Sequence, residues 1–141
     1  MKLAWAGLVS LGLLIAVPAV VEGQDSSAAS QVQLHRNYPN PFNPETTIPF
    51  SLDYSLWETG ERPVVSLRIY NILAQLVAVP ILQGSGEPLD NMQLGWNGTG
   101  EYAAYWDGKV VGSGREAASG VYVYQLVVNG QAQSKRMTIV K

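Results

Sequence analysis

Apolar and polar residues alternate with a period of two along much of the chain, which is the pattern of half-buried β-strands. The clearest case is residues 64–72, where Val65, Leu67 and Ile69 share one face. No stretch keeps the 3.6-residue period of an amphipathic helix. The same alternation, broken by glycine, proline and asparagine, predicts further strands at residues 46–52, 75–81, 92–96 and 101–106, with a short one at 109–111.

The C-terminal part of the sequence predicts a β-hairpin with a defined register. Asn129-Gly130 separates two alternating segments, and this dipeptide is the strongest short hairpin signal. A two-residue loop places Val128 opposite Gln131, and therefore Tyr124 opposite Lys135. One face of the hairpin is the expected core, and it carries Tyr122, Tyr124, Leu126, Met137 and Ile139.

About seven short strands separated by turns predict an all-β fold, an immunoglobulin-like β-sandwich. Lys2 precedes an uncharged apolar run, and small residues follow near Ala19 and Gly23, as in a signal peptide cleaved after one of them. The alternative is an uncleaved membrane anchor, since the run is long enough to span a bilayer. We therefore divide the chain into a signal peptide (1–23), a polar linker (24–36) and the sandwich domain (37–141).

Residues 37–44, which we call the strap, hold three prolines within six positions. Each proline fixes φ and removes an N–H, and each disfavours helix in the residue before it. The strap is therefore expected to be stiff and extended, with Tyr38 and Phe42 as anchors. Pro49, in the strand that follows, predicts that this strand is kinked or lies at a sheet edge.

Composition narrows the function classes. The chain has 141 residues, no cysteine, one histidine and a net charge of −2, which argues against nucleic-acid binding and leaves no metal cluster or nucleophile–base pair. His35 is expected to be a solvated linker residue. Loop carboxylates such as Asp90 and Asp107 could bind calcium, but they are better explained as turn formers. The sequence thus indicates no enzyme, no catalytic residue, no metal and no cofactor.

Aromatic residues offer one further alternative, a sugar-binding platform. Burial in the core is the preferred interpretation of the set, which comprises Trp96, Tyr102, Tyr105, Trp106, Tyr122 and Tyr124.

Three groups of segments together resemble a known family. They are the strap with Thr46-Thr47-Ile48; residues 67–77; and Trp106-Asp107-Gly108 with residues 119–126 and the chain end at 135–141. Their order and spacing are similar to the type A C-terminal sorting domain of type IX secretion cargo, which is related to the immunoglobulin-like domain of flagellar hook-capping proteins. The resemblance covers roughly residues 34–141.

The resemblance implies an exported, non-catalytic domain that directs a protein through the periplasm and across the outer membrane to the cell surface or the medium. The implied partners are an outer-membrane translocon and a surface sortase-like enzyme. The domain is expected to be monomeric, and to meet a membrane only through the signal peptide or surface attachment. The alternative is a stand-alone structural or adhesive module of the hook-cap type.

Carried over residue by residue, the resemblance assigns two segments. It places translocon recognition on Lys135, Arg136, Met137, Thr138, Ile139, Val140 and Lys141. It assigns the strap motif to Asn37, Tyr38, Pro39, Asn40, Pro41, Phe42, Asn43 and Pro44. For the basic residues the alternative is that they only solvate a sheet edge and discourage aggregation.

One turn departs from the family pattern. Where the family has Leu-Gly-Gln, this chain has Leu73-Ala74-Gln75. If that turn needs the positive φ of a glycine, Ala74 must adopt a conformation that L-residues rarely take.

Overall fold

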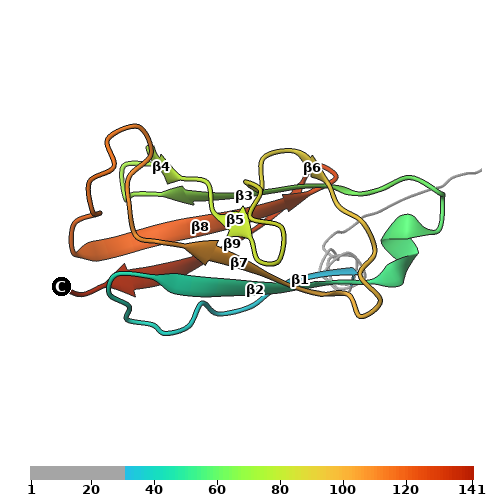
Figure 1. Cartoon of the computed structure of the whole chain (residues 1–141), viewed down its shortest axis with the longest axis horizontal. Coiled ribbons are helices and arrows are strands. Elements are labelled where there is room, and N and C mark those ends of the chain that lie inside the picture. The colour runs from blue at the N-terminus through green and yellow to red at the C-terminus, as the bar shows by residue number, and fades with distance from the viewer. Residues whose placement is uncertain (1–30) are drawn as a thin grey trace, which may run out of the picture.

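A computed structural model describes residues 31–141, which form two packed antiparallel sheets (Figure 1). The predicted signal peptide lies outside the described residues. In the described part of the chain, one 3₁₀ helix, η1 (Tyr54–Trp57), lies between the second and third strands. The strands are β1 (Val32–Leu34), β2 (Thr46–Leu52), β3 (Val64–Tyr70), β4 (Leu76–Ala78), β5 (Ile81–Leu82), β6 (Met92–Gln93), β7 (Glu101–Trp106), β8 (Gly120–Val128) and β9 (Gln131–Ile139).

The strand order is that of an immunoglobulin-type sandwich. One sheet runs β1-β2-β7-β5 and the other β4-β3-β8-β9, with β6 pairing to β3. The first, second, fifth and fourth strands of an immunoglobulin domain lie in one sheet in that order, and the third, sixth and seventh lie in the other. The Tyr122 hydroxyl donates to the carbonyl of Ala118 at 2.7 Å, which is the corner contact that such folds make at the start of the sixth strand. The predicted fold class is confirmed.

The predicted hairpin is confirmed with its register. Asn129 (φ 50°) and Gly130 (φ 86°) both occupy the left-handed region that a two-residue hairpin turn requires. Val128 pairs with Gln131, and Tyr124 with Lys135. All members of the predicted core face are buried, namely Tyr122, Tyr124, Leu126, Met137 and Ile139.

The described residues form nine strands and not about seven, because one predicted strand is divided into two and one strand was not predicted. The expected strand 75–81 is divided: β4 pairs with β3, whereas β5 pairs with β7 in the opposite sheet. The chain changes sheets at Val79 and Pro80, where the missing N–H of proline suits the interruption of a ladder. Residues 109–111 form only an isolated bridge, Lys109 to Glu116.

The other addition is β1, which falls inside the predicted linker. Val32 and Leu34 are buried, and β1 pairs with the end of β2. The sandwich therefore includes residues that precede the predicted domain start at residue 37. A three-residue strand is too short to show an alternating pattern, so the polar residues around it concealed it.

Pro49 lies in a strand that is not at an edge, contrary to one of the two expectations. β2 runs between β1 and β7. The carbonyl of Pro49 accepts from the His35 N–H at 3.0 Å, on the side where β1 has already ended. The position of the missing N–H is on that same side, so the pairing of β2 with β7 is not interrupted.

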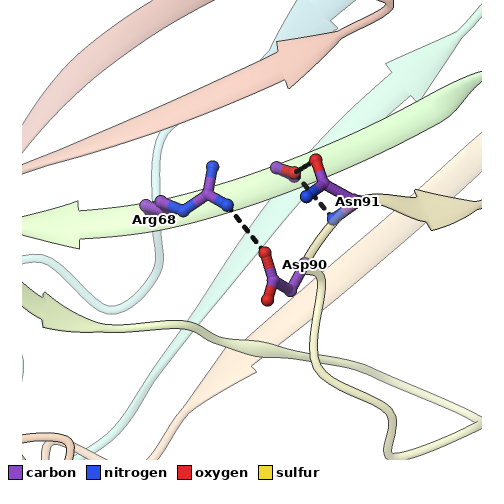
Figure 2. A network of polar contacts seen from close by, with 4 residues as sticks. Arg68, Asp90 and Asn91 are labelled. Carbon is purple, nitrogen blue, oxygen red and sulfur yellow. Dashed lines mark hydrogen bonds and ion pairs between the residues drawn. The ribbon is translucent and has the colours of Figure 1, made fainter.

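A polar network fixes the loop before β6 against the outer face of β3 (Figure 2). The Arg68 guanidinium donates to an Asp90 carboxylate oxygen at 2.7 Å. The Ser66 hydroxyl accepts from the Asn91 N–H at 2.8 Å and lies 3.1 Å from its Oδ1. The Asp90 carboxylate therefore forms an ion pair with Arg68. Asp107 forms the expected turn, because its Oδ1 accepts from the Lys109 N–H at 3.0 Å.

Across residues 31–141, no helix combines the length and the apolar character needed to cross a membrane.

Candidate docking site formed by the strap and the terminal strand

The structure brings together the two segments that the resemblance singled out, although they lie at opposite ends of the domain sequence. Phe42 forms a parallel bridge with Ile139. The Phe42 N–H donates to the Thr138 carbonyl at 3.1 Å, and the Val140 N–H donates to the Phe42 carbonyl at 3.1 Å. Asn40 adds a third contact, because its Oδ1 accepts from the Thr138 N–H at 3.1 Å. The strap therefore pairs with the outer edge of the sheet at the C-terminal end of β9.

Phe42 anchors the strap, as predicted, but Tyr38 does not. Phe42 is 2% exposed, and its ring packs edge-to-face on Trp106 with the centroids 5.6 Å apart. Tyr38 is 57% exposed, because its backbone pairs with Thr47 and its neighbour Asn37 takes the inward position. The sequence placed two aromatics near the strap prolines but could not show which one turns inward.

Asn37 attaches the start of the strap to the core. Its N–H donates to the Tyr124 hydroxyl at 3.1 Å, and its Nδ2 donates to the Thr46 hydroxyl at 3.0 Å. The Tyr124 hydroxyl in turn donates to the His35 carbonyl at 2.8 Å. The side-chain oxygen of Asn37 is buried and has no hydrogen-bond partner among the described residues. One core tyrosine thus connects β8 to the segment that enters the strap.

His35 is not the solvated linker residue that the sequence predicted. It is half-buried, its Nε2 lies 2.7 Å from the Ser51 hydroxyl, and its N–H and carbonyl are both hydrogen-bonded. This prediction was wrong for the same reason as the one for β1: residues assigned to the linker belong to the sandwich.

The end of the strap packs against the turn that follows β7. Gly108 is buried at φ +83°, and a Cβ built on it would overlap the carbonyl oxygen of Pro44. The turn itself is held by the Trp106 indole N–H, which donates to the Lys109 carbonyl at 3.0 Å. The turn formed by Trp106-Asp107-Gly108 is therefore the surface against which the end of the strap packs. The three X–Pro bonds of the strap, at Pro39, Pro41 and Pro44, are cis.

The predicted recognition residues of the terminal segment divide into two groups. Met137 and Ile139 are 1% and 3% exposed and belong to the core. The side chains available to a partner are Thr138, which is half-buried, and the exposed Lys135, Arg136, Val140 and Lys141. Lys141 Nζ lies 3.2 Å from a Glu116 carboxylate oxygen. The alternation along β9 accounts for the division, because the two buried residues share the face of Tyr122 and Tyr124.

β9 is an edge strand whose outer side is only partly covered. The Gln133 side chain reaches β1 in the other sheet, where its Oε1 accepts from the Leu34 N–H at 3.0 Å and its Nε2 donates to the Val32 carbonyl at 2.7 Å, so it satisfies backbone groups of β1 and none of β9. The strap covers the C-terminal end of the β9 edge at Thr138. Backbone groups on a strand alternate in direction, so Ser134 and Arg136 point the same way as Thr138. Within the described residues β9 pairs as a strand only with β8, which leaves this edge open at Ser134 and Arg136, before the strap contact.

The aromatic residues considered as a sugar platform are mostly in the core. Tyr102, Trp106, Tyr122 and Tyr124 are buried, whereas Trp96 is 37% exposed. The described part of the chain contains no group of histidine and acidic side chains suited to a metal ion.

Burial raises the pKa of the Tyr124 hydroxyl above its usual value of 10.0, and the hydrogen bond from the Asn37 N–H and the charge of Arg36 oppose this only in part. The unfolded chain then ionises first as the pH rises, so this contribution is present below about pH 10 and is lost above it. We expect Tyr124→Phe to cost about 1–3 kcal/mol near neutral pH, because the Asn37 N–H and the His35 carbonyl lose their partner.

Urea unfolding at about pH 7.5 and about pH 11 measures this effect. The variant should lose less stability than the wild type between the two conditions. Part of the alkaline decline should remain, since burial also raises the pKa of Tyr102. An equal decline in both proteins would contradict the role given to Tyr124.

Comparison with known proteins gives structural matches at low identity. No family model matches the chain, and no curated protein sequence matches it. Among solved structures, PorZ, an essential bacterial surface component of the type IX secretion system of Porphyromonas gingivalis, matches with 17% identity over 77% of this chain and a TM-score of 0.45. The alkylpurine DNA glycosylase AlkC of Pseudomonas fluorescens, bound to DNA, matches with 16% identity over 79% of this chain and a TM-score of 0.46.

These matches concern small parts of larger proteins. The chain spans 12% of the PorZ chain and 31% of the AlkC chain.

Proposed function

We propose that this chain is a non-catalytic sorting domain of the type IX secretion pathway, which directs an exported protein across the outer membrane to the cell surface or the medium. The observation that carries the proposal is the pairing of Phe42 with Thr138 and Val140. The resemblance assigned both the strap and the terminal segment, which lie at opposite ends of the domain sequence. Their assembly into one surface fits a single recognition element built from both.

The proposed contact surface combines charge with an open sheet edge. Lys135 and Arg136 are exposed in the interval of β9 between Gln133 and the strap, and Lys141 ends the chain beyond the strap. An extended segment of a translocon component can add to such an edge by main-chain hydrogen bonds, and acidic side chains on it would meet the cations. A surface sortase-like enzyme would act after export.

The test is a reporter fused ahead of the domain in a host with this pathway. We expect the triple variant Lys135→Glu, Arg136→Glu and Lys141→Glu to reduce surface delivery about tenfold or more, because like charges across an interface cost several kcal/mol. The reporter should accumulate in the periplasm. The melting temperature of the purified domain should change little, since all three side chains are exposed.

A matched control replaces three exposed cations elsewhere, Arg62, Lys109 and Arg115, by glutamate. This variant has the same net charge and should be delivered normally. Normal delivery of the first triple variant would overturn the proposal. Deletion of residues 135–141 is a poorer test, because it removes Met137 and Ile139 from the core.

The alternative, an adhesive or structural module, predicts a different fate for the chain. Mass spectrometry of the surface and medium fractions would then find the domain intact, and delivery would not depend on the three cations.

A further inference from the structure

An exposed apolar patch lies on the outer face of the second sheet, around the turn between β3 and β4. Ile72 is 77% exposed, Leu73 73%, Leu76 44% and Val121 43%. Contiguous apolar surface of this kind on a soluble domain marks an interaction site. We define the apolar patch as Tyr70, Ile72, Leu73, Leu76, Val121 and Val123.

Strand register makes the patch continuous. Tyr70 pairs with Leu76 on one side and with Val123 on the other, and Val121 lies two residues along the same face of β8. A groove of about 350 Å³ runs through it, lined by Tyr70, Asn71, Ile72, Ala74, Val123 and Gln125.

The turn that carries Ile72 and Leu73 is held in place. The Asn71 Oδ1 accepts from the N–H groups of Leu73 at 2.9 Å and Gln75 at 3.0 Å, and its Nδ2 donates to the Gln75 side chain at 2.8 Å. Ala74 adopts φ 63°, the conformation that the sequence indicated would be needed there. The turn thus presents two large apolar side chains to solvent in a fixed geometry, which lowers the ordering cost of binding.

A cation stands at the rim of the patch. Arg136 pairs directly with Val123 across β8 and β9, so the two side chains are on the same face. Arg136 is exposed, and the ion pairs among the described residues, Arg68–Asp90 and Lys141–Glu116, do not include it. A partner that covers the patch therefore meets a positive charge at its edge.

This charge argues against a second copy of the chain as the occupant. A symmetric dimer contacts the same patch on both subunits. The patch as defined holds no carboxylate, so such a dimer would bring in two Arg136 side chains and no acidic partner for either of them. A partner with a carboxylate beside apolar side chains gains from both features.

We propose that the apolar patch, with Arg136 at its rim, docks a protein surface that presents apolar side chains beside a carboxylate. This inference rests on the proposed function, in which that protein belongs to the export machinery. The partner would then bind only the folded domain, because the patch forms only when β3 pairs with β4 and β8. The open edge of β9 is adjacent, since Arg136 contributes its backbone to that edge and its side chain to the patch.

The experiment uses the same reporter fusion with the double variant Ile72→Ser and Leu73→Ser. We expect surface delivery to fall about tenfold, the effect of losing about 1.4 kcal/mol of binding. The melting temperature should stay within a few degrees, because both side chains are exposed. Val111→Ser, at an apolar residue that is 56% exposed in another loop, is the control and should be delivered normally.

A photo-crosslinking amino acid at position 72 gives a direct readout. It should form an adduct with an epitope-tagged subunit of the outer-membrane translocon, the same residue placed at position 111 should not, and Arg136→Glu should weaken the adduct at 72. Normal delivery of the double variant together with no adduct would overturn the inference. If the double variant is delivered but the reporter carrying the Lys135, Arg136 and Lys141 triple variant is not, the proposed sorting function is retained and the role of the patch is rejected. If the reporter is delivered with every variant, both proposals are rejected.

Two other occupants would also overturn the inference. One is a lipid surface, shown if the wild-type domain sediments with vesicles of phosphatidylethanolamine and phosphatidylglycerol and the double variant does not. The other is a second copy, shown if sedimentation equilibrium finds a wild-type dimer that the double variant abolishes.

Discussion

Replacing Gly108 by alanine is expected to detach the strap from the sandwich and to lower the free energy of unfolding by about 2–5 kcal/mol. Two effects add. A Cβ at this position overlaps the Pro44 carbonyl oxygen and lies 3.1 Å from its carbon, and a backbone group cannot move aside as a flexible side chain can. The φ of +83° also costs about 1–2 kcal/mol for a residue with a side chain.

Gly112→Ala is the matched control, because its φ of +86° is similar and no atom lies within 4 Å of its added Cβ. This variant should lose only the conformational part. Urea unfolding of both proteins measures the difference, and hydrogen exchange at the Phe42 and Val140 amides shows whether the strap has been released. Equal losses in the two variants would mean that the contact between Gly108 and the strap contributes nothing.

Phe42→Ala is expected to cost about 3–5 kcal/mol, the range for removing a buried phenylalanine. The ring is 2% exposed and packs on Trp106, which also contacts Tyr122 edge-to-face with the centroids 6.0 Å apart. The lost contacts therefore reach from the strap into the core. Equilibrium unfolding in urea and thermal unfolding both measure the change.

Tyr38→Ala is the control in the same strap. Tyr38 is 57% exposed, so its loss should change stability by less than about 1 kcal/mol. In the reporter fusion, Phe42→Ala should also reduce delivery, because the strap would no longer pair with Thr138 and Val140. A small stability change at Phe42, similar to that at Tyr38, would contradict the assignment of Phe42 as the anchor.

Much of the fold was predictable because its signals are local. Asn129-Gly130 fixes the hairpin turn, and the period of two then assigns every residue of β8 and β9 to a face. The bounds of β2 and β7 also agree with the predicted strands, since turn residues limit both.

The candidate site was predictable only in part. The sequence identified the strap and the terminal residues as separate segments, but not that Phe42 would bridge to Ile139. The hairpin register had already placed Met137 and Ile139 on the core face, and their burial agrees with that prediction and not with the recognition role that the resemblance gave them. The apolar patch was missed because Ile72 and Leu73, in a turn, have no periodic pattern, and only the exposed fraction of a side chain separates a surface leucine from a core one.

The sequence by itself determined the all-β class and the hairpin register, since each depends on backbone preferences of residues near one another. The tertiary structure decided which strap aromatic turns inward, that β1 joins the sandwich, and that strap and terminal strand form one surface. Those outcomes depend on contacts between distant segments, whose free energy comes from burial and from pairing of backbone groups that no local pattern records.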